Sequence, residues 1–315
     1  MRRILSIDGG GIKGVFPAAF LATIEEATGL RIADYFDLIV GTSTGGIIAL
    51  GLGLAFSGSD LLRFYERYGP QIFPKRNFAF LRRWFGEKYS VAPLKAALEE
   101  QFGGRLLGES KSRLVIPALN LDNGDVHIYK TAHHPHFEID YKIPVVDVAL
   151  STSAAPTYFR EHIGHSGPAL VDGGLWANNP TGLAVVEAIG VLEWDREEID
   201  LLSIGCTTSP LQSMNAGHGG KGEAYYAMRI VDLFMCAQSF GSLGTAAVLI
   251  GHNHIQRYSV AVDRKRFDLA DADGIPELRR LGESEARKAL PAIRATFLGQ
   301  PAEPFSPYRR VDGQL

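Results

Sequence analysis

The sequence predicts an α/β fold with a mostly parallel central sheet, and three observations lead to this prediction. Apolar runs of strand length alternate with runs of helical periodicity over the first sixty residues. The links between these runs are short and rich in glycine, as in βαβ units. The 315 residues are 46% hydrophobic with a formal net charge of −3, so the chain can bury a large core and is not dominated by disorder.

The first sixty residues contain two strand–helix pairs. Residues 3–7 suit a strand buried on both faces, and residues 15–27 have helical spacing and are closed by Gly29. A second strand is expected at 36–40 and a second helix at 47–56. The apolar stretch from 36 to 56 is long enough for a membrane span, but a charged Asp37 and a glycine-rich turn inside it favour strand, turn and helix.

Later segments extend the same pattern. Asp122-Asn123-Gly124-Asp125 lies between two apolar runs and predicts a hairpin turn. The expected elements are strands at 114–121, 126–129, 169–172 and 199–204, helices at 145–154 and 183–192, and a charged helix at 275–297 interrupted or kinked at Pro291. Residues 214–222 are expected to form a mobile loop. With no internal repeat or linker, one domain over residues 1–315 is the simplest expectation.

Composition excludes several classes of protein. The slightly negative net charge argues against binding of nucleic acid polymers through a basic surface. Two cysteines, Cys206 and Cys236, are too few for a disulfide framework, which indicates a reducing compartment. The apolar run after Arg3 ends at Asp8 and is too short for a signal peptide. We therefore expect a cytoplasmic protein.

A G-x-S-x-G pattern, Gly41-Thr42-Ser43-Thr44-Gly45, lies directly between a predicted buried strand and a helix. Such a turn is so tight that side chains flanking the serine would collide, which explains a glycine two residues to either side. It would place the Ser43 hydroxyl at a helix N-terminus, where negative charge is favoured. The pattern alone also arises by chance, so its strand–turn–helix context is what indicates a nucleophile.

A second glycine turn, Asp8-Gly9-Gly10-Gly11-Ile12-Lys13-Gly14, also follows a strand and precedes a helix. It can be interpreted as a dinucleotide-binding turn, but that needs an acidic residue at the end of the next strand, which runs instead into the serine turn. Alternatively, its amides form an oxyanion hole, because neighbouring parallel strands end at the same edge of the sheet. We favour the oxyanion hole; a simple glycine turn is the remaining alternative.

A serine nucleophile needs a base, and none of the nine histidines stands in a context typical of a catalytic triad. We expect solvated or capping histidines, and no metal site, because His133, His134, His136, His252 and His254 lack further ligands at metal-binding spacing. The better candidate is Asp172, which ends a predicted strand and precedes Gly173 and Gly174. A carboxylate against Ser43 can accept the hydroxyl proton.

The three motifs together, at 8–14, 41–45 and 172–174, resemble the patatin-like phospholipase family in order and spacing, as does the run at 151–156. This resemblance covers about residues 3–205. It implies a three-layer α/β/α fold, a Ser43–Asp172 dyad and no metal or other cofactor for the chemistry. The expected activity is hydrolysis of acyl esters of glycerophospholipids through an acyl-serine. The implied oxyanion glycines and other motif positions are Gly9, Gly10, Gly11, Lys13, Gly14, Gly41, Gly45, Gly173 and Gly174; many family members carry Arg where this chain has Lys13.

Residues 73–89 interleave aromatic and basic side chains, among them Trp84 and Phe85. This composition is typical of a surface that meets anionic lipid, and equally of a half-buried cap over the active site. The two interpretations are compatible, because a mobile cap can also be the part that contacts the membrane. We therefore expect peripheral contact with the membrane.

The N-terminal half also resembles bacterial effector phospholipases of anti-phage signalling (CBASS) operons. That resemblance implies a latent enzyme, activated by a 3′,3′-linked cyclic dinucleotide such as cGAMP, which then degrades the inner membrane of the host cell. Residues 206–315 are the candidate regulatory region. Tyr225, Tyr226 and Arg229 are a guess for its nucleotide contacts, with helix packing as the alternative. A homo-oligomer is a candidate assembly.

Two other classes of function remain open at this point. One is a binding module for nucleotide or lipid in which Ser43 is incidental. The other is an ungated soluble acyl esterase or thioesterase of the same fold. The sequence does not specify the head group, the acyl position or the activator.

Overall fold

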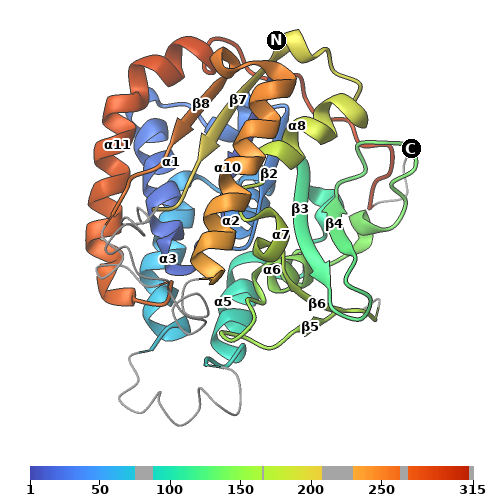
Figure 1. Cartoon of the computed structure of the whole chain (residues 1–315), viewed down its shortest axis with the longest axis vertical. Helices are drawn as coiled ribbons and strands as arrows, with labels where there is room; N and C mark the ends of the chain where they lie inside the picture. The colour runs from blue at the N-terminus through green and yellow to red at the C-terminus, as the bar shows by residue number, and fades with distance from the viewer. Residues whose placement is uncertain (75–87, 165–166, 208–229, 263–268, 312–315) are drawn as a thin grey trace, which may run out of the picture.

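The computed structural model describes residues 1–74, 88–164, 167–207, 230–262 and 269–311. Its centre is a sheet of eight strands in the order β5-β6-β3-β2-β1-β7-β8, with β4 paired to β3 (Figure 1). The strands are β1 (Arg2–Ile7), β2 (Leu38–Gly41), β3 (Arg113–Asn120), β4 (Val126–Lys130), β5 (His162–Ile163), β6 (Ala169–Asp172), β7 (Ile199–Ile204) and β8 (Ile255–Tyr258). The pairs from β3 through β2, β1 and β7 to β8 are all parallel, which confirms the predicted α/β class.

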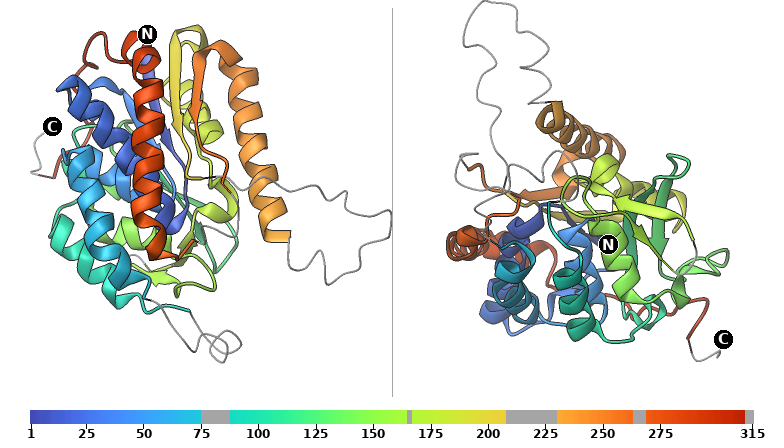
Figure 2. Two further views of the ribbon diagram at one scale, coloured as in Figure 1. Left: turned by 90° about the vertical axis from the view of Figure 1, so that its left-hand side faces the viewer. Right: turned by 90° about the horizontal axis from the view of Figure 1, so that it is seen from below.

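Helices cover both faces of the sheet. They are α1 (Val15–Thr28), α2 (Thr44–Gly53), α3 (Gly58–Ile72), α5 (Ala92–Phe102), α6 (Val145–Ser153), α7 (Gly174–Ala177), α8 (Thr181–Gly190), α10 (Ile230–Ile250) and α11 (Ile275–Thr296). The first five named, with α11, share one apolar cluster with one face of the sheet, whereas α8 and α10 share a second cluster with the other (Figure 2). The apolar residues of β1 enter both clusters, Leu5 and Ile7 the first and Ile4 the second, so this strand is buried between the two layers of helices.

The expected elements agree with the structure except at some boundaries. The strand expected at 36–40 begins at Leu38, and the helix expected from 47 begins at Thr44, directly after the serine turn. The sequence predicts a helix interrupted or kinked at Pro291. In the structure, helix α11 is not interrupted there and continues to Thr296. Pro291 lies on the exposed side of that helix, where water can satisfy the carbonyl that loses its partner. The loop expected at 214–222 lies outside the described residues.

Asp172 ends β6, a strand that runs antiparallel to its neighbour β3. Strand β3 pairs with β2 only through residues 113–115 and then extends past the carboxyl end of β2. The antiparallel strand β6 pairs with this overhang, with Asp172 opposite Ala118. The carboxyl end of β6 therefore returns toward the edge at which β1 and β2 end.

Candidate active site

The serine turn is a strained elbow between β2 and α2. Ser43 has φ 55° and ψ −122°, a conformation that non-glycine residues rarely adopt. A Cβ at Gly41 would meet the carbonyl oxygen of Gly45, and a Cβ at Gly45 would meet the carbonyl oxygens of Ile7 and Asp8. The two glycines are thus required, one by the elbow itself and the other by the close approach of the first glycine turn.

Ser43 and Asp172 form a buried hydrogen-bonded pair. The Ser43 hydroxyl donates to Asp172 Oδ2 at 2.6 Å, and the Gly174 amide donates to Asp172 Oδ1 at 2.7 Å. Burial raises the pKa of Asp172 to about 6, against the lowering effect of these two hydrogen bonds. At neutral pH the carboxyl group is therefore mostly ionised, yet it is a stronger base than an exposed aspartate.

The first glycine turn lies against the serine. A Cβ on Gly9 would approach the Ser43 Cβ to 3.2 Å, and a Cβ on Gly14 would meet the hydroxyl of Thr44. The Gly9 amide, however, already donates to the carbonyl oxygen of Asn178 at 2.9 Å. Within the described residues, the amides of Gly10 and Gly11 donate to no acceptor. The amides of Gly10 and Gly11 are therefore the ones that a ligand beside Ser43 can use.

A model of the patatin-like phospholipase family matches residues 5–185, which include all three motifs. This chain belongs to that family. Membership makes it a lipid acyl hydrolase.

Three relatives illustrate the similarity. The cGAMP-activated phospholipase of Pseudomonas aeruginosa is 33% identical over 299 residues, which cover 91% of this chain and 88% of that protein. The cGAMP-activated phospholipase of Vibrio cholerae is 36% identical, over 64% of this chain and 63% of that protein. Patatin-like protein 2 of Oryza sativa subsp. indica is 34% identical, over 70% of this chain and 64% of its own length. The match thus spans less than two thirds of the Vibrio and rice proteins.

In this patatin-like phospholipase, threonines that sequence reasoning missed hold the elbow. The Ser43 amide donates to Thr152 Oγ1 at 3.0 Å, and the Thr152 hydroxyl donates to the carbonyl oxygen of Pro117 at 2.6 Å. Thr42 donates to the carbonyl oxygen of Ala177 at 2.5 Å on the other side. Thr152 lies in the run at 151–156 that resembles the family, so its position was visible although its role was not.

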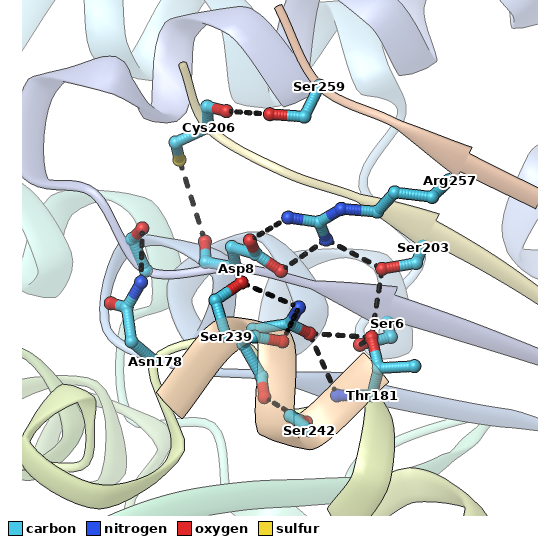
Figure 3. A network of polar contacts seen from close by, with 12 residues as sticks. Ser6, Asp8, Asn178, Thr181, Ser203, Cys206, Ser239, Ser242, Arg257 and Ser259 are labelled. Atoms are coloured by element: carbon cyan, nitrogen blue, oxygen red, sulfur yellow. Dashed lines mark hydrogen bonds and ion pairs between the residues drawn. The ribbon is translucent and has the colours of Figure 1, made fainter. Parts of the chain in front are cut away.

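A buried ion pair holds the start of the glycine turn from outside the matched region (Figure 3). Arg257, on β8, donates through Nη1 to Asp8 Oδ1 at 2.7 Å and through Nη2 to Asp8 Oδ2. The same Nη1 donates to Ser203 Oγ at 2.7 Å. Burial raises the pKa of Asp8, and Arg257 partly offsets this by favouring the carboxylate. Because Gly9 follows Asp8, this pair fixes where the oxyanion candidates begin.

The C-terminal part of this phospholipase contacts the same turn twice more. The Ile12 amide donates to the carbonyl oxygen of Leu269 at 2.9 Å, and a Cβ on Gly11, which has φ +58°, would meet that same oxygen. The thiol of Cys206 lies 3.6 Å from the carbonyl oxygen of Asp8. Lys13 is half-buried in the turn, and its amide donates to the Gly10 carbonyl oxygen at 3.1 Å.

No histidine in the described part of the chain bonds Ser43 or Asp172. His133, expected to be solvated or capping, is instead buried: its ring nitrogens lie 2.9 Å from Thr131 Oγ1 and 2.9 Å from Glu187 Oε1. The described residues also contain no cluster of three His, Cys, Asp or Glu side chains arranged for a metal ion. Trp84, Phe85, Tyr225, Tyr226 and Arg229 lie outside the described residues; of the segment at 73–89, the flanking Phe73 and Tyr89 pack on Phe159.

Proposed function

We propose that this chain hydrolyses the acyl esters of glycerophospholipids, with Ser43 as nucleophile and Asp172 as its base. The observation that carries the proposal is the 2.6 Å hydrogen bond from the Ser43 hydroxyl to the buried Asp172 carboxylate. A buried carboxylate with a pKa near 6 is matched to proton transfer at neutral pH.

In the first step, Ser43 Oγ attacks the ester carbonyl carbon and its proton passes to Asp172. The tetrahedral intermediate carries a negative charge on the former carbonyl oxygen. We assign the amides of Gly10 and Gly11 to this oxygen, together with the N-terminus of α2, which begins at Thr44. The Gly9 amide is not assigned to this oxygen, because it donates to the carbonyl oxygen of Asn178. Gly9 instead allows the turn to pass close to Ser43.

Collapse of the intermediate breaks the bond between the acyl carbon and the alcohol oxygen. Asp172 returns its proton to that oxygen, so a lysophospholipid leaves and the acyl group remains on Ser43. Water then attacks the acyl-serine while Asp172 accepts its proton, and breakdown of the second intermediate returns a proton to Ser43. The cycle releases a fatty acid and uses no metal ion or other cofactor.

The test is release of fatty acid from phospholipid vesicles, with Ser43→Ala as the blank. Loss of release in Ser43→Ala and in Asp172→Asn supports the dyad, provided both variants retain the melting temperature of the parent chain. Hydrolysis of soluble esters with no action on vesicles in any condition identifies the soluble esterase instead. If Ser43→Ala retains its activity or its ligand binding while no ester is cleaved, the binding-module alternative is correct.

We further propose that a cyclic dinucleotide activates the enzyme, and that it then attacks the inner face of the cell membrane during anti-phage defence. Support comes from relatives named cGAMP-activated phospholipase that are 33% to 36% identical to this chain. The Arg257–Asp8 pair offers a route, because it links residues beyond the family match to the catalytic turn. Fatty-acid release measured with and without 3′,3′-cGAMP tests this. Equal rates of release would refute activation by the dinucleotide but not the phospholipase activity.

A further inference from the structure

Helix α10 has an unusual composition for a helix on the outside of a protein. No Asp, Glu, Lys or Arg occurs from Leu233 to Ile250, and by length and composition this segment can cross a membrane. It does not stand alone, however: Ala246 and Ile250 enter the apolar cluster beneath α8 and the sheet. Only three of these eighteen residues, Ala246, Ala247 and Ile250, are buried.

The polarity of this helix is reversed relative to a helix in water. Three of its polar side chains contact the rest of the protein: Gln238 Oε1 accepts from the Asn178 amide at 2.8 Å, and Ser242 Oγ accepts from the Gly182 amide at 2.8 Å. Ser239 Oγ accepts from Asn179 Nδ2 at 3.0 Å (Figure 3). Outer helices usually show the opposite arrangement, with the apolar stripe inside.

From Leu233 to Ile250, the outward side of α10 carries no charged residue. Its phenylalanines are 54% exposed at Phe234 and 74% exposed at Phe240, and Val248 is 85% exposed. We call the exposed residues of α10 the outer apolar face; they are Phe234, Ala237, Phe240, Gly241, Gly244, Thr245 and Val248. Exposed Val186 of α8 and Leu175 of α7 lie on helices that pack against α10. Such a grouping marks an interaction surface.

The inner side of α10 contacts the turns that hold the proposed site. Gln238 accepts from the Asn178 amide and donates, at 3.4 Å, to the carbonyl oxygen of Gly174, two residues after Asp172. The Asn178 carbonyl oxygen in turn accepts from the amide of Gly9. Asn178 therefore joins α10 to the first glycine turn, and Gln238 joins α10 to the turn that follows Asp172.

We infer that the outer apolar face of α10 docks the enzyme on a phospholipid surface. This inference rests on the proposed function, because a lipid surface is where the substrate of a phospholipase resides. The choice of occupant rests on the contacts on the inner side of α10: Gln238 bonds Asn178 and Gly174, so lipid on the outer face is separated by this one helix from the turn that carries the proposed base. An uncharged helix face with exposed phenylalanines is what partition into the acyl boundary of a bilayer requires.

The experiment measures vesicle binding in the Ser43→Ala background, so that binding is separated from hydrolysis. The full chain is sedimented with vesicles of phosphatidylethanolamine and phosphatidylglycerol, with and without 3′,3′-cGAMP. Replacing Phe234 and Phe240 together by Ser should lower binding about tenfold, the loss expected from removing two partly inserted rings. The matched control is Ile139→Ser, which removes an apolar side chain that is 71% exposed directly before η4 (Asp140–Lys142) and is not part of α10.

A soluble short-chain ester separates this inference from the proposed function. In the active background, the double variant should lose hydrolysis of vesicles but not of the ester, whereas failure of every form on both substrates refutes the proposed function itself. Vesicle binding equal to that of the control overturns the inference. A second outcome also overturns the inference: the parent chain forms a dimer, and the double variant is monomeric but binds vesicles as well as the parent does. The occupant of the face is then a second copy of the chain.

Discussion

The edge of the sheet that holds Ser43 and the outer apolar face of α10 are built in opposite ways, although Asn178 connects that edge to the inner side of the same helix. At the edge, the groups around Ser43, from Thr152 to Gly174, are paired at hydrogen-bond distance and shielded from solvent. On the outer face, the side chains from Phe234 to Val248 are uncharged and exposed in the part of the chain that the structure describes. The polar groups of the first region find their partners within the chain, whereas the exposed apolar side chains of the second favour contact with an apolar phase such as lipid. Substitutions at the edge should therefore lower the hydrolysis of every substrate. Substitutions on the outer apolar face should lower only the hydrolysis of lipid in a bilayer.

The largest effect is expected at the dyad. Asp172→Asn keeps the shape of the side chain but removes the base, so turnover of both vesicles and a soluble ester should fall by about 10³-fold or more. Stopped or steady-state assays on the two substrates measure this, with melting temperature as the check on folding. Loss on vesicles alone would contradict the assignment of Asp172 as base.

The next effect concerns Arg257, which acts through Asp8. Arg257→Lys loses the two-pronged contact but keeps a positive charge, and the turn that follows Asp8 should shift. We expect kcat to fall about ten- to a hundredfold with little change in KM, on soluble and vesicle substrates alike. Arg257→Met, which leaves the Asp8 carboxylate buried and unpaired, should in addition unfold more easily by about 3 kcal/mol or more. A change in KM alone with Arg257→Lys would show that Arg257 does not position the turn.

The pH dependence of turnover sharpens the same comparison. Because Asp172 must be ionised to accept a proton and its pKa is raised to about 6, kcat should decline as the pH falls through 6. At pH 5 about one tenth of the sites would be ionised, so kcat for the soluble ester should be about tenfold below its plateau. A profile that stays flat down to pH 5 would show that Asp172 keeps an ordinary pKa. Vesicle binding by Ser43→Ala should not follow this profile.

The smallest effect is expected from single changes on outer helices. Val248→Asp on α10 should reduce vesicle hydrolysis about threefold and leave the soluble ester unaffected. The control is α11 on the other face of the sheet, whose exposed residues include Arg279, Arg280, Arg287, Lys288 and Arg294. Exchange of Arg294 for Ala should change neither rate by more than about 1.5-fold, because α11 is already suited to water. Equal responses of the two helices would remove the distinction between them.

The contrast between α10 and α11 also explains what the sequence could predict. Helix α11 shows a strong alternation of apolar and charged residues, so its start at Ile275 could be assigned directly. Helix α10 has no such alternation, because from Leu233 onward it has no charged residue and few polar ones, and no helix was predicted there. Strands β6 and β7 were predicted to the residue, since turn residues bound short apolar runs.

At the site, the sequence predicts Ser43 as nucleophile and Asp172 as base, but it does not predict how the chain brings the two residues together. The sequence offers no indication that β3 extends beyond β2 or that β6 pairs with it antiparallel. Nor does the sequence indicate that the Gly9 amide donates to the carbonyl oxygen of Asn178, because the two residues are 169 positions apart. Roles that depend on tertiary pairing, such as those of Thr152 and Arg257, have no local signature.

The return of β6 onto the overhang of β3 has a consequence for the life of the protein in the cell. Ser43 is translated 129 residues before Asp172, and the two meet only when β3 and β6 have paired. On the proposed mechanism, a nascent or half-folded chain therefore has a serine without its proton acceptor. The proposed hydrolase then has no activity during synthesis, since the sheet must be complete before the first ester can be cut.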